Sequence, residues 1–398
     1  MNIKVIRGQN QIGGSIIEIS SDTTKIILDV GSELNETTLV TPDVDGLFYG
    51  RPSYDAVFLS HYHGDYIGLL DRVLEGIPVY IGKAAYEVTN AARKYTRKPE
   101  YSFTGFLEPG KPINVGDMVI TPYLCDHSAF DSYMLHVYCN GKTLLYSGDF
   151  RAKGRKNFTL LLNRLPHVDV LVIEGTTLSR LSAAQVTEEE LEQRAFDEIS
   201  KTDAPVFVLM AATNIDRLVT VYKATRRANR VLLQDLYLAA VSSAAGKTIP
   251  NPKGFSGIWV FPTNGSGERY KELSSYGQAK IGRQSIAKKK FVMCIRPSMR
   301  SYLTKLSEHV SFEGGILFYS MWEGYKQKED MAEFLYYMHG KGVKIVSLHT
   351  SGHADSETID ALIGGVQPKT IIPVHTENAA WFERYHDIAI AKDQLFCF

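Results

Sequence analysis

The sequence predicts an α/β protein in which an α/β domain with a mostly parallel sheet is inserted into a strand-dominated domain. Residues 1–185 contain many short β-rich segments and few helical patterns. Strands and helices begin to alternate near residue 185. After Val346, histidine and aspartate residues that could bind a metal occur again, as they do in the first part. We therefore expect one domain to comprise residues 1–185 and 346–398, and the inserted domain to comprise residues 186–345.

The strands of the first part are predicted from aliphatic and β-branched runs bounded by turn residues. Ser15–Ile19 and Lys25–Val30 are two such runs, separated by the turn-like Ser20-Ser21-Asp22. Further strands are expected at Ala56–Leu59, Met118–Ile120, Tyr133–Val137, Thr143–Tyr146 and Val168–Ile173.

The alternating part begins with a helix signal at Thr187-Glu188-Glu189-Glu190. Thr187 can cap the helix and Glu190 stands three positions later, which is the pattern of a capping box. Leu191, Ala195 and Ile199 then recur at helical spacing. Beyond them we expect strands at 206–210, 230–233, 290–295 and 316–319, and helices at 215–228, 237–245, 299–308 and 328–338.

Composition excludes several classes of protein. The 44 basic and 44 acidic residues give a formal net charge of zero, which argues against a protein that coats nucleic acid by charge alone. We expect no membrane association, because no apolar stretch is long enough to span a bilayer and the N-terminus lacks a signal-peptide pattern. The four cysteines are widely spaced and form no CxxC pair, which indicates a reducing, cytoplasmic location and argues against a cysteine-based zinc site.

Metal-capable side chains gather in His61-Tyr62-His63-Gly64-Asp65, directly after a predicted strand. Imidazole and carboxylate groups suit a zinc-like ion, and we expect Gly64 to permit the tight backbone that lets them converge. An isolated pair of histidines is more often a surface loop feature. Here further candidates follow other β-like runs, and strand ends of one sheet edge would bring them together: His127, Asp149 and His375.

The order HxHxD, His, Asp, His resembles the metallo-β-lactamase fold. Other segments resemble its β-CASP branch, which includes ribonuclease J and the messenger-RNA 3′-end-processing endonuclease. The segments that carry this second resemblance are Ile173–Thr177, His349–Asp355 and Pro373–Glu377, with Ala212–Leu218 and Ser320–Tyr325 in the inserted part. The resemblance covers essentially the whole chain. It implies an αββα metallo-β-lactamase sandwich with an inserted α/β β-CASP domain.

The resemblance also implies roles for individual residues. One zinc ion would be held by His61, His63 and His127, while Asp149 would bridge to a second ion bound also by Asp65 and His375. Two such ions can activate a hydroxide at neutral pH and neutralise charge on a phosphoryl group. His353 would act beside the scissile phosphate as a general acid or transition-state donor, oriented by Glu174. The implied catalytic residues are Asp65, Glu174 and His353.

One position departs from the family pattern. Tyr66 stands where the family has a histidine, and a phenol with a pKa of about 10 is a poor ligand. Three interpretations are open: the second ion keeps Asp65, Asp149 and His375 with water; Tyr66 binds as phenolate; or the second site is weak. An inactive relative is disfavoured because the remaining ligands and His353 are present.

The expected substrate is RNA, with single-stranded DNA as an alternative and a homodimer as an option. A phosphate backbone requires positive charge near the cleft, and the expected substrate contacts are Ser351, Arg296, Arg217 and Arg151. The predicted function is a metal-dependent ribonuclease that hydrolyses phosphodiester bonds with a metal-activated hydroxide. Two alternatives remain, a small-molecule metallo-hydrolase such as a lactonase or thioesterase, and a non-catalytic RNA-binding relative.

Overall fold

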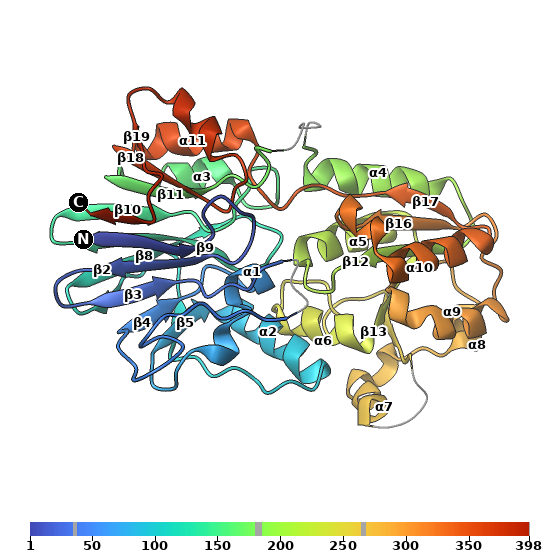
Figure 1. The fold of residues 1–398 in the computed structure, drawn as a ribbon. Helices are drawn as coiled ribbons and strands as arrows, with labels where there is room; N and C mark the ends of the chain where they lie inside the picture. The colour runs from blue at the N-terminus through green and yellow to red at the C-terminus, as the bar shows by residue number, and fades with distance from the viewer. Residues whose placement is uncertain (35–37, 180–184, 264–267, 398) are drawn as a thin grey trace. The chain divides into compact units, whose positions relative to one another are not determined.

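The computed structural model describes residues 1–34, 38–179, 185–263 and 268–397 (Figure 1). They form two compact units. The first comprises Met1–Tyr86, Tyr101–Gln185 and Ser351–Phe398, and the second comprises Glu87–Glu100 and Val186–Thr350. The domain boundaries predicted at 185/186 and 345/346 stay a prediction. None of the helices in the described ranges is both long and apolar enough to cross a membrane.

The first unit contains two sheets. One has the strand order β20-β1-β2-β3-β4-β5-β6 and the other the order β19-β18-β11-β10-β9-β8-β7. The first sheet consists of β1 (Asn2–Arg7), β2 (Ile16–Ser20), β3 (Lys25–Leu28), β4 (Ala56–Phe58), β5 (Val79–Gly82), β6 (Gly105–Leu107) and β20 (Leu395–Cys397). The second consists of β7 (Ile113–Val115), β8 (Met118–Cys125), β9 (Ser132–Cys139), β10 (Lys142–Tyr146), β11 (Val170–Glu174), β18 (Thr370–Val374) and β19 (Ala389–Ile390).

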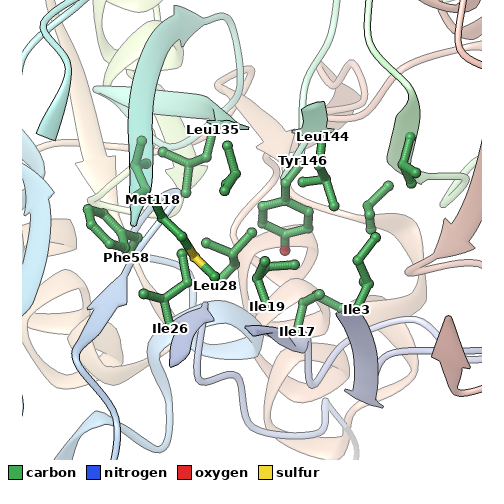
Figure 2. Packing of buried hydrophobic residues seen from close by; sticks show 14 of the residues in the cluster. Ile3, Ile17, Ile19, Ile26, Leu28, Phe58, Met118, Leu135, Leu144 and Tyr146 are labelled. Carbon is green, nitrogen blue, oxygen red and sulfur yellow. The ribbon is translucent and has the colours of Figure 1, made fainter. Parts of the chain in front are cut away.

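Aliphatic side chains from both sheets form the core of this unit. In Figure 2, Ile17, Ile19 and Leu28 of the first sheet point toward Met118 and Tyr146 of the second. All five are buried. Ile17 and Ile19 of β2, like Ile26 and Leu28 of β3, stand at alternate positions, so each pair lies on the strand face that meets the opposing sheet.

Helices cover the outer faces of the two sheets. On the second sheet, buried residues of α3 (Phe158–Leu162) and α11 (Ser356–Val366) pack with Leu145 and Leu171 of the strands. On the side of the first sheet, α1 (Gly64–Ile67), the 3₁₀ turn η1 (Leu70–Arg72) and the start of α2 (Lys83–Tyr95) follow β4 and β5 in the chain (Figure 1). The predicted αββα sandwich is confirmed. A last 3₁₀ segment, η5 (Ala379–Arg384), follows β18.

The second unit contains one parallel sheet, of order β14-β13-β15-β12-β16-β17. The predicted parallel sheet is therefore confirmed. Its strands are β12 (Val206–Met210), β13 (Val231–Asp235), β14 (Ile258–Phe261), β15 (Phe291–Ile295), β16 (Ile316–Ser320) and β17 (Lys344–Ser347). Its helices are α4 (Glu188–Ser200), α5 (Ile215–Arg227), α6 (Leu236–Ala244), α7 (Glu268–Glu272), α8 (Arg283–Ile286), α9 (Arg300–Ser307) and α10 (Glu329–Gly340), with 3₁₀ segments η2 (Leu273–Ala279), η3 (Pro297–Met299) and η4 (Glu323–Gln327).

The capping box predicted at the start of α4 is confirmed. The Thr187 side chain accepts a hydrogen bond from the Glu190 backbone N–H at 3.1 Å, and the Glu190 carboxylate accepts one from the Thr187 N–H at 2.6 Å. These two bonds satisfy donors that the first turn of a helix leaves without partners.

Arg217 is a correction to the predicted substrate contacts. Its guanidinium is completely buried and pairs with Glu188 of α4, Nη2 lying 3.1 Å from Oε1. Nη1 also donates to the Leu348 carbonyl and the Ser320 hydroxyl, while Thr220 donates to Glu188 at 2.6 Å. A guanidinium that is saturated and shielded from solvent stabilises the second unit and does not contact a phosphate in this conformation.

We expect Glu188→Ala to destabilise the second unit by about 3–5 kcal/mol, because it leaves the charge of Arg217 buried and unpaired. Urea denaturation measures this loss, followed by tryptophan fluorescence in a Trp381→Phe background, so that the signal comes from Trp259 and Trp322 of the second unit. Glu189→Ala is the matched control, since Glu189 is the neighbouring, exposed glutamate of the same helix. Equal stability of the two variants would contradict the structural role assigned to the pair.

Candidate metal centre and active site

The candidate site lies within the first unit, where strand ends meet. The parallel strands β10, β11 and β18 are adjacent and their carboxyl ends share one edge, which is where α/β sheets carry ligand sites. Asp149 follows β10, Glu174 ends β11 and His375 follows β18 directly. The topology therefore brings together side chains that are up to 226 positions apart in the chain.

Two groups of side chains at this edge could each hold a metal ion. The ligand atoms within each group lie within 4.8 Å of one another. Asp149 belongs to both groups. The first group is His61, His63, His127 and Asp149, and the second is Asp149, Glu174, His353 and His375.

The His61 ring is fixed by a buried relay. Ser60 Oγ donates to Asp29 Oδ2 at 2.8 Å and lies 3.0 Å from His61 Nδ1, and the Ser60 backbone N–H donates to Asp29 Oδ1 at 2.7 Å. A proton on Nδ1 completes the relay and leaves a lone pair on His61 Nε2. The relay thus selects the tautomer that can bind a metal.

His127 is oriented in the same way by a backbone carbonyl. Its Nδ1 lies 2.5 Å from the Gly352 oxygen and donates to it. Its Nε2 lies 3.1 Å from His63 Nδ1. The two nitrogens are therefore close enough to bind one ion together.

His375 is held by a hydroxyl. Thr176 Oγ1 lies 2.8 Å from His375 Nδ1 and 2.6 Å from Glu174 Oε2, to which it donates. The other ring nitrogen, Nε2, lies 3.1 Å from Asp65 Oδ2. This arrangement places Nε2 of His375 and the carboxylate of Asp65 side by side, where both could bind one ion.

Two buried atoms at the centre indicate that the residues fit a cation. His61 Nε2 and Asp149 Oδ2 have no hydrogen-bond partner among the residues that the structure describes. They lie 3.7 Å apart, and His127 Nε2 is also 3.7 Å from Asp149 Oδ2. Buried polar atoms are normally satisfied, and a divalent ion bound by imidazole and carboxylate groups would satisfy these.

The protonation states of His61 and His127 favour metal binding. Burial lowers the pKa of His61 to about 3, and it holds the pKa of His127 well below its usual value. Both rings are therefore neutral, the form that a metal requires. Burial raises the pKa of Asp149, but the charges of His353 and His375 outweigh it and hold that pKa well below its usual range.

Glu174 connects the loops that carry the site. Its carboxylate accepts hydrogen bonds from the Phe150 N–H at 3.0 Å, from Thr176 Oγ1 and from His353 Nδ1 at 3.1 Å. His353 Nδ1 also lies 3.5 Å from Asp149 Oδ2. The ring of His353 retains some exposure, with 22% of its side chain accessible, whereas Glu174 is buried. The pair leaves Nε2 of His353 as the donor available to a ligand.

Tyr66 is buried in α1, and its hydroxyl bonds a carboxylate. Its hydroxyl donates to Asp149 Oδ1. Burial and the charge of Asp149 hold the pKa of Tyr66 well above its usual value. In this structure it is therefore a neutral hydrogen-bond donor.

The close backbone approach in this region occurs at Gly31. The expectation that Gly64 permits it is wrong. A Cβ on Gly64 would meet nothing within 4 Å, and Gly64 simply begins α1. A Cβ on Gly31 would lie 1.7 Å from the carbonyl oxygen of Asp65. The close approach of these two backbone segments therefore requires glycine at position 31.

Arg151 is a second correction to the predicted substrate contacts. It is buried, with Nε 2.6 Å from Asp126 Oδ1. Its Nη1 donates to the Ser351 carbonyl at 3.3 Å, and Ser351 Oγ accepts from the His353 N–H at 3.1 Å. Arg151 and the Ser351 hydroxyl thus support the loop of His353 from within the protein.

Arg296 retains access to solvent within the second unit. Nη2 lies 2.5 Å from Asp235 Oδ2, and the guanidinium lies 5.2 Å from the ring centroid of Tyr237 and 5.8 Å from that of Tyr95. Its side chain is 28% exposed. Of the three predicted cationic contacts, Arg296 is the one that solvent reaches, and it is paired with Asp235.

Sequence reasoning missed the residues that orient the ligands. Asp29, Ser60 and Thr176 are each directly beside a predicted strand end or a predicted ligand. A polar residue that interrupts a buried apolar run, as Asp29 does after Leu28, was the available signal.

Comparison with known proteins supports a metal-binding role for this site. The sequence profile of the metallo-β-lactamase superfamily matches residues 11–198, and that of the Zn-dependent metallo-hydrolase RNA specificity domain matches residues 342–386. The chain is 23% identical to ribonuclease J 2 of Streptococcus pyogenes over 98% of its own length and 71% of that protein's. It is 23% identical to ribonuclease J of Helicobacter pylori, covering 95% of this chain and 56% of that protein.

A solved structure shares the fold. A protein of unknown function from Enterococcus faecalis superposes with a TM-score of 0.83 at 19% identity, covering 100% of this chain and 99% of the other. At that identity the likeness extends to the fold alone.

We expect Ser60→Ala to weaken zinc binding about 10- to 100-fold, because it breaks the relay that orients His61. Competition against a chromogenic chelator measures the affinity. Ser21→Ala is the matched control: its hydroxyl also bonds an aspartate, Asp117 at 2.7 Å, but stands beyond the opposite end of β3. An unchanged affinity in Ser60→Ala would show that the relay does not position the ligand.

Proposed function

We propose that the chain is a metal-dependent ribonuclease of the β-CASP branch of the metallo-β-lactamase superfamily, similar to ribonuclease J. The observation that carries this proposal is the shared carboxylate. Asp149 belongs to two clusters of metal-capable side chains, and the second includes His353, which Glu174 orients and whose side chain is 22% exposed. A metal cluster alone suits many hydrolases, whereas an additional oriented imidazole suits a leaving group that needs a proton.

The residues fit zinc, and we propose His61, His63, His127 and Asp149 as ligands of one ion. Asp65, Asp149 and His375 are proposed for a second. When bound, such ions lower the pKa of water to supply a nucleophile and stabilise negative charge on a phosphoryl group.

The protein side chains would supply the proton for the leaving group and position the reacting groups. His353 would donate a proton from Nε2 to the departing oxygen, since Nδ1 faces Glu174 at 3.1 Å. Glu174 would hold that ring in place and stabilise its charged form. Asp65 would fix His375 through the 3.1 Å contact to Nε2. The hydroxyl of Ser351 is already engaged by the His353 N–H, so its role is to position the loop.

RNA is the proposed substrate because the RNA specificity profile covers residues 342–386, which include His353 and His375. The chain spans 71% of the length of the first relative and 56% of the second, so their activity is carried over as part of this proposal. Single-stranded DNA as a substrate and a homodimer stay predictions. A cytoplasmic location is also proposed, in keeping with the free cysteines Cys125, Cys139, Cys294 and Cys397.

We expect His353→Ala to lower the rate of RNA hydrolysis about 10²- to 10⁴-fold, because it removes the general acid. The measurement is cleavage of 5′-labelled RNA by zinc-loaded protein, with the metal content of each variant determined in parallel. His167→Ala, an exposed histidine of the same unit, is the control.

Intact RNA with the wild-type protein at full metal occupancy would contradict the ribonuclease assignment. Parallel assays with lactone and thioester substrates test the small-molecule alternative. Hydrolysis of those esters without cleavage of RNA would favour that alternative.

We expect Arg296→Gln to weaken RNA binding and to reduce the slope of log affinity against log salt by about 1, because one phosphate contact is lost. Binding is measured in the His353→Ala background so that RNA stays intact. Arg300→Gln is the control, since Arg300 is an exposed arginine four positions later that pairs with Glu333. An unchanged salt slope would remove Arg296 from the substrate contacts.

A further inference from the structure

Tyr66 occupies the space between the two sides of the candidate metal centre. Its ring centroid lies 4.1 Å from that of His61 and 5.2 Å from that of His375. Its backbone is fixed as well, because its N–H donates to the His63 carbonyl at 2.9 Å and its carbonyl accepts from the Val30 N–H at 2.8 Å. The side chain therefore has little freedom to turn away from Asp149.

The two oxygens of Asp149 differ because of this side chain. Oδ2 lies 3.7 Å from both His61 Nε2 and His127 Nε2 and has no hydrogen-bond partner among the described residues. Oδ1 accepts the hydrogen bond from the Tyr66 hydroxyl and lies 3.7 Å from His375 Nδ1. The carboxylate is thus open toward the first group of histidines and capped toward the side of Asp65 and His375.

Building on the proposed metal-dependent function, we propose that Tyr66 makes the two metal positions unequal. One divalent ion binds tightly at His61, His63, His127 and Asp149 Oδ2. A second ion binds weakly, because the Tyr66 hydroxyl takes up Asp149 Oδ1 and supplies no lone pair in its place.

Ligand chemistry supports this asymmetry. The hydroxyl of Tyr66 is a donor in its bond to the carboxylate, so the proton stands between the oxygen and any cation. In the second group, Glu174 and His353 are paired with each other at 3.1 Å. The second position therefore keeps the Asp65 carboxylate and His375 Nε2, which also lie 3.1 Å apart. Two protein ligands and a capped carboxylate are fewer than the three that catalytic zinc sites normally use.

The test is zinc binding to the full chain. Metal-free protein is titrated with Zn²⁺ by calorimetry, and the ions retained after desalting are counted by mass spectrometry. We expect the wild type to retain one ion per chain and to bind a second about 10- to 100-fold more weakly. Tyr66→His, which supplies an imidazole at this position, is expected to retain two.

Tyr66→Phe separates the hydrogen bond from the ring. It frees Asp149 Oδ1 without adding a ligand, so we expect it to retain one ion and to bind the second more tightly than the wild type does. Circular dichroism and thermal unfolding establish that each variant is folded. Because the phenyl ring conserves the packing around His61 and His375, this variant keeps the test informative even where Tyr66→His is unstable.

Three results would overturn the inference. The wild type could retain two ions of indistinguishable affinity, or folded Tyr66→His could retain one. Alternatively, loading with Fe³⁺ could produce a phenolate-to-metal absorption band that Tyr66→Phe abolishes, which would make Tyr66 a ligand. Retention of no ion by any variant would instead contradict the proposed metal-dependent function.

Discussion

A carboxylate can be buried as an anion only where cations or hydrogen-bond donors surround it, and Asp149 meets that condition at the end of β10. Imidazoles approach one of its oxygens and a phenol donates to the other. The neighbouring ligands are themselves oriented by a second layer of polar groups. The Asp29–Ser60 relay, the Gly352 carbonyl and the Thr176–Glu174 pair each engage one histidine. These polar groups therefore fix the orientation of the imidazole rings around Asp149.

The sheet topology makes this convergence possible. β10, β11 and β18 are parallel neighbours, so their carboxyl ends deliver Asp149, Glu174 and His375 to one edge. These strands contribute residues to the core between the two sheets, part of which Figure 2 shows. Their close packing holds the strand ends in place. His353, the proposed general acid, needs some access to solvent and is carried on a loop instead. Functional residues of proteins commonly lie on loops that a rigid scaffold of strands or helices positions.

Periodic features of the fold were predictable from the sequence, whereas interactions across the chain were not. Long aliphatic runs such as Val206–Met210 were recognised because they are buried on both faces. Helix α2 was missed because several of its buried residues are polar, among them Thr89, Asn90 and Arg93. The metal-capable residues were identified by type and order. Arg151 and Arg217 were assigned to the surface because their buried carboxylate partners, Asp126 and Glu188, cannot be identified from local pattern.

The pairing of β11 with β18 has a consequence for biosynthesis. Glu174 pairs with Val374, so the ribosome must add a further 200 residues before β11 acquires its neighbour. At about 5–20 residues per second this interval lasts about 10–40 s. During it the nascent first unit presents an open strand edge, which can pair with other chains, and it lacks His353 and His375. Conditions that slow synthesis of the second unit would therefore favour aggregation of the first, and a bound metal ion could add its full stabilisation only after the chain is almost complete.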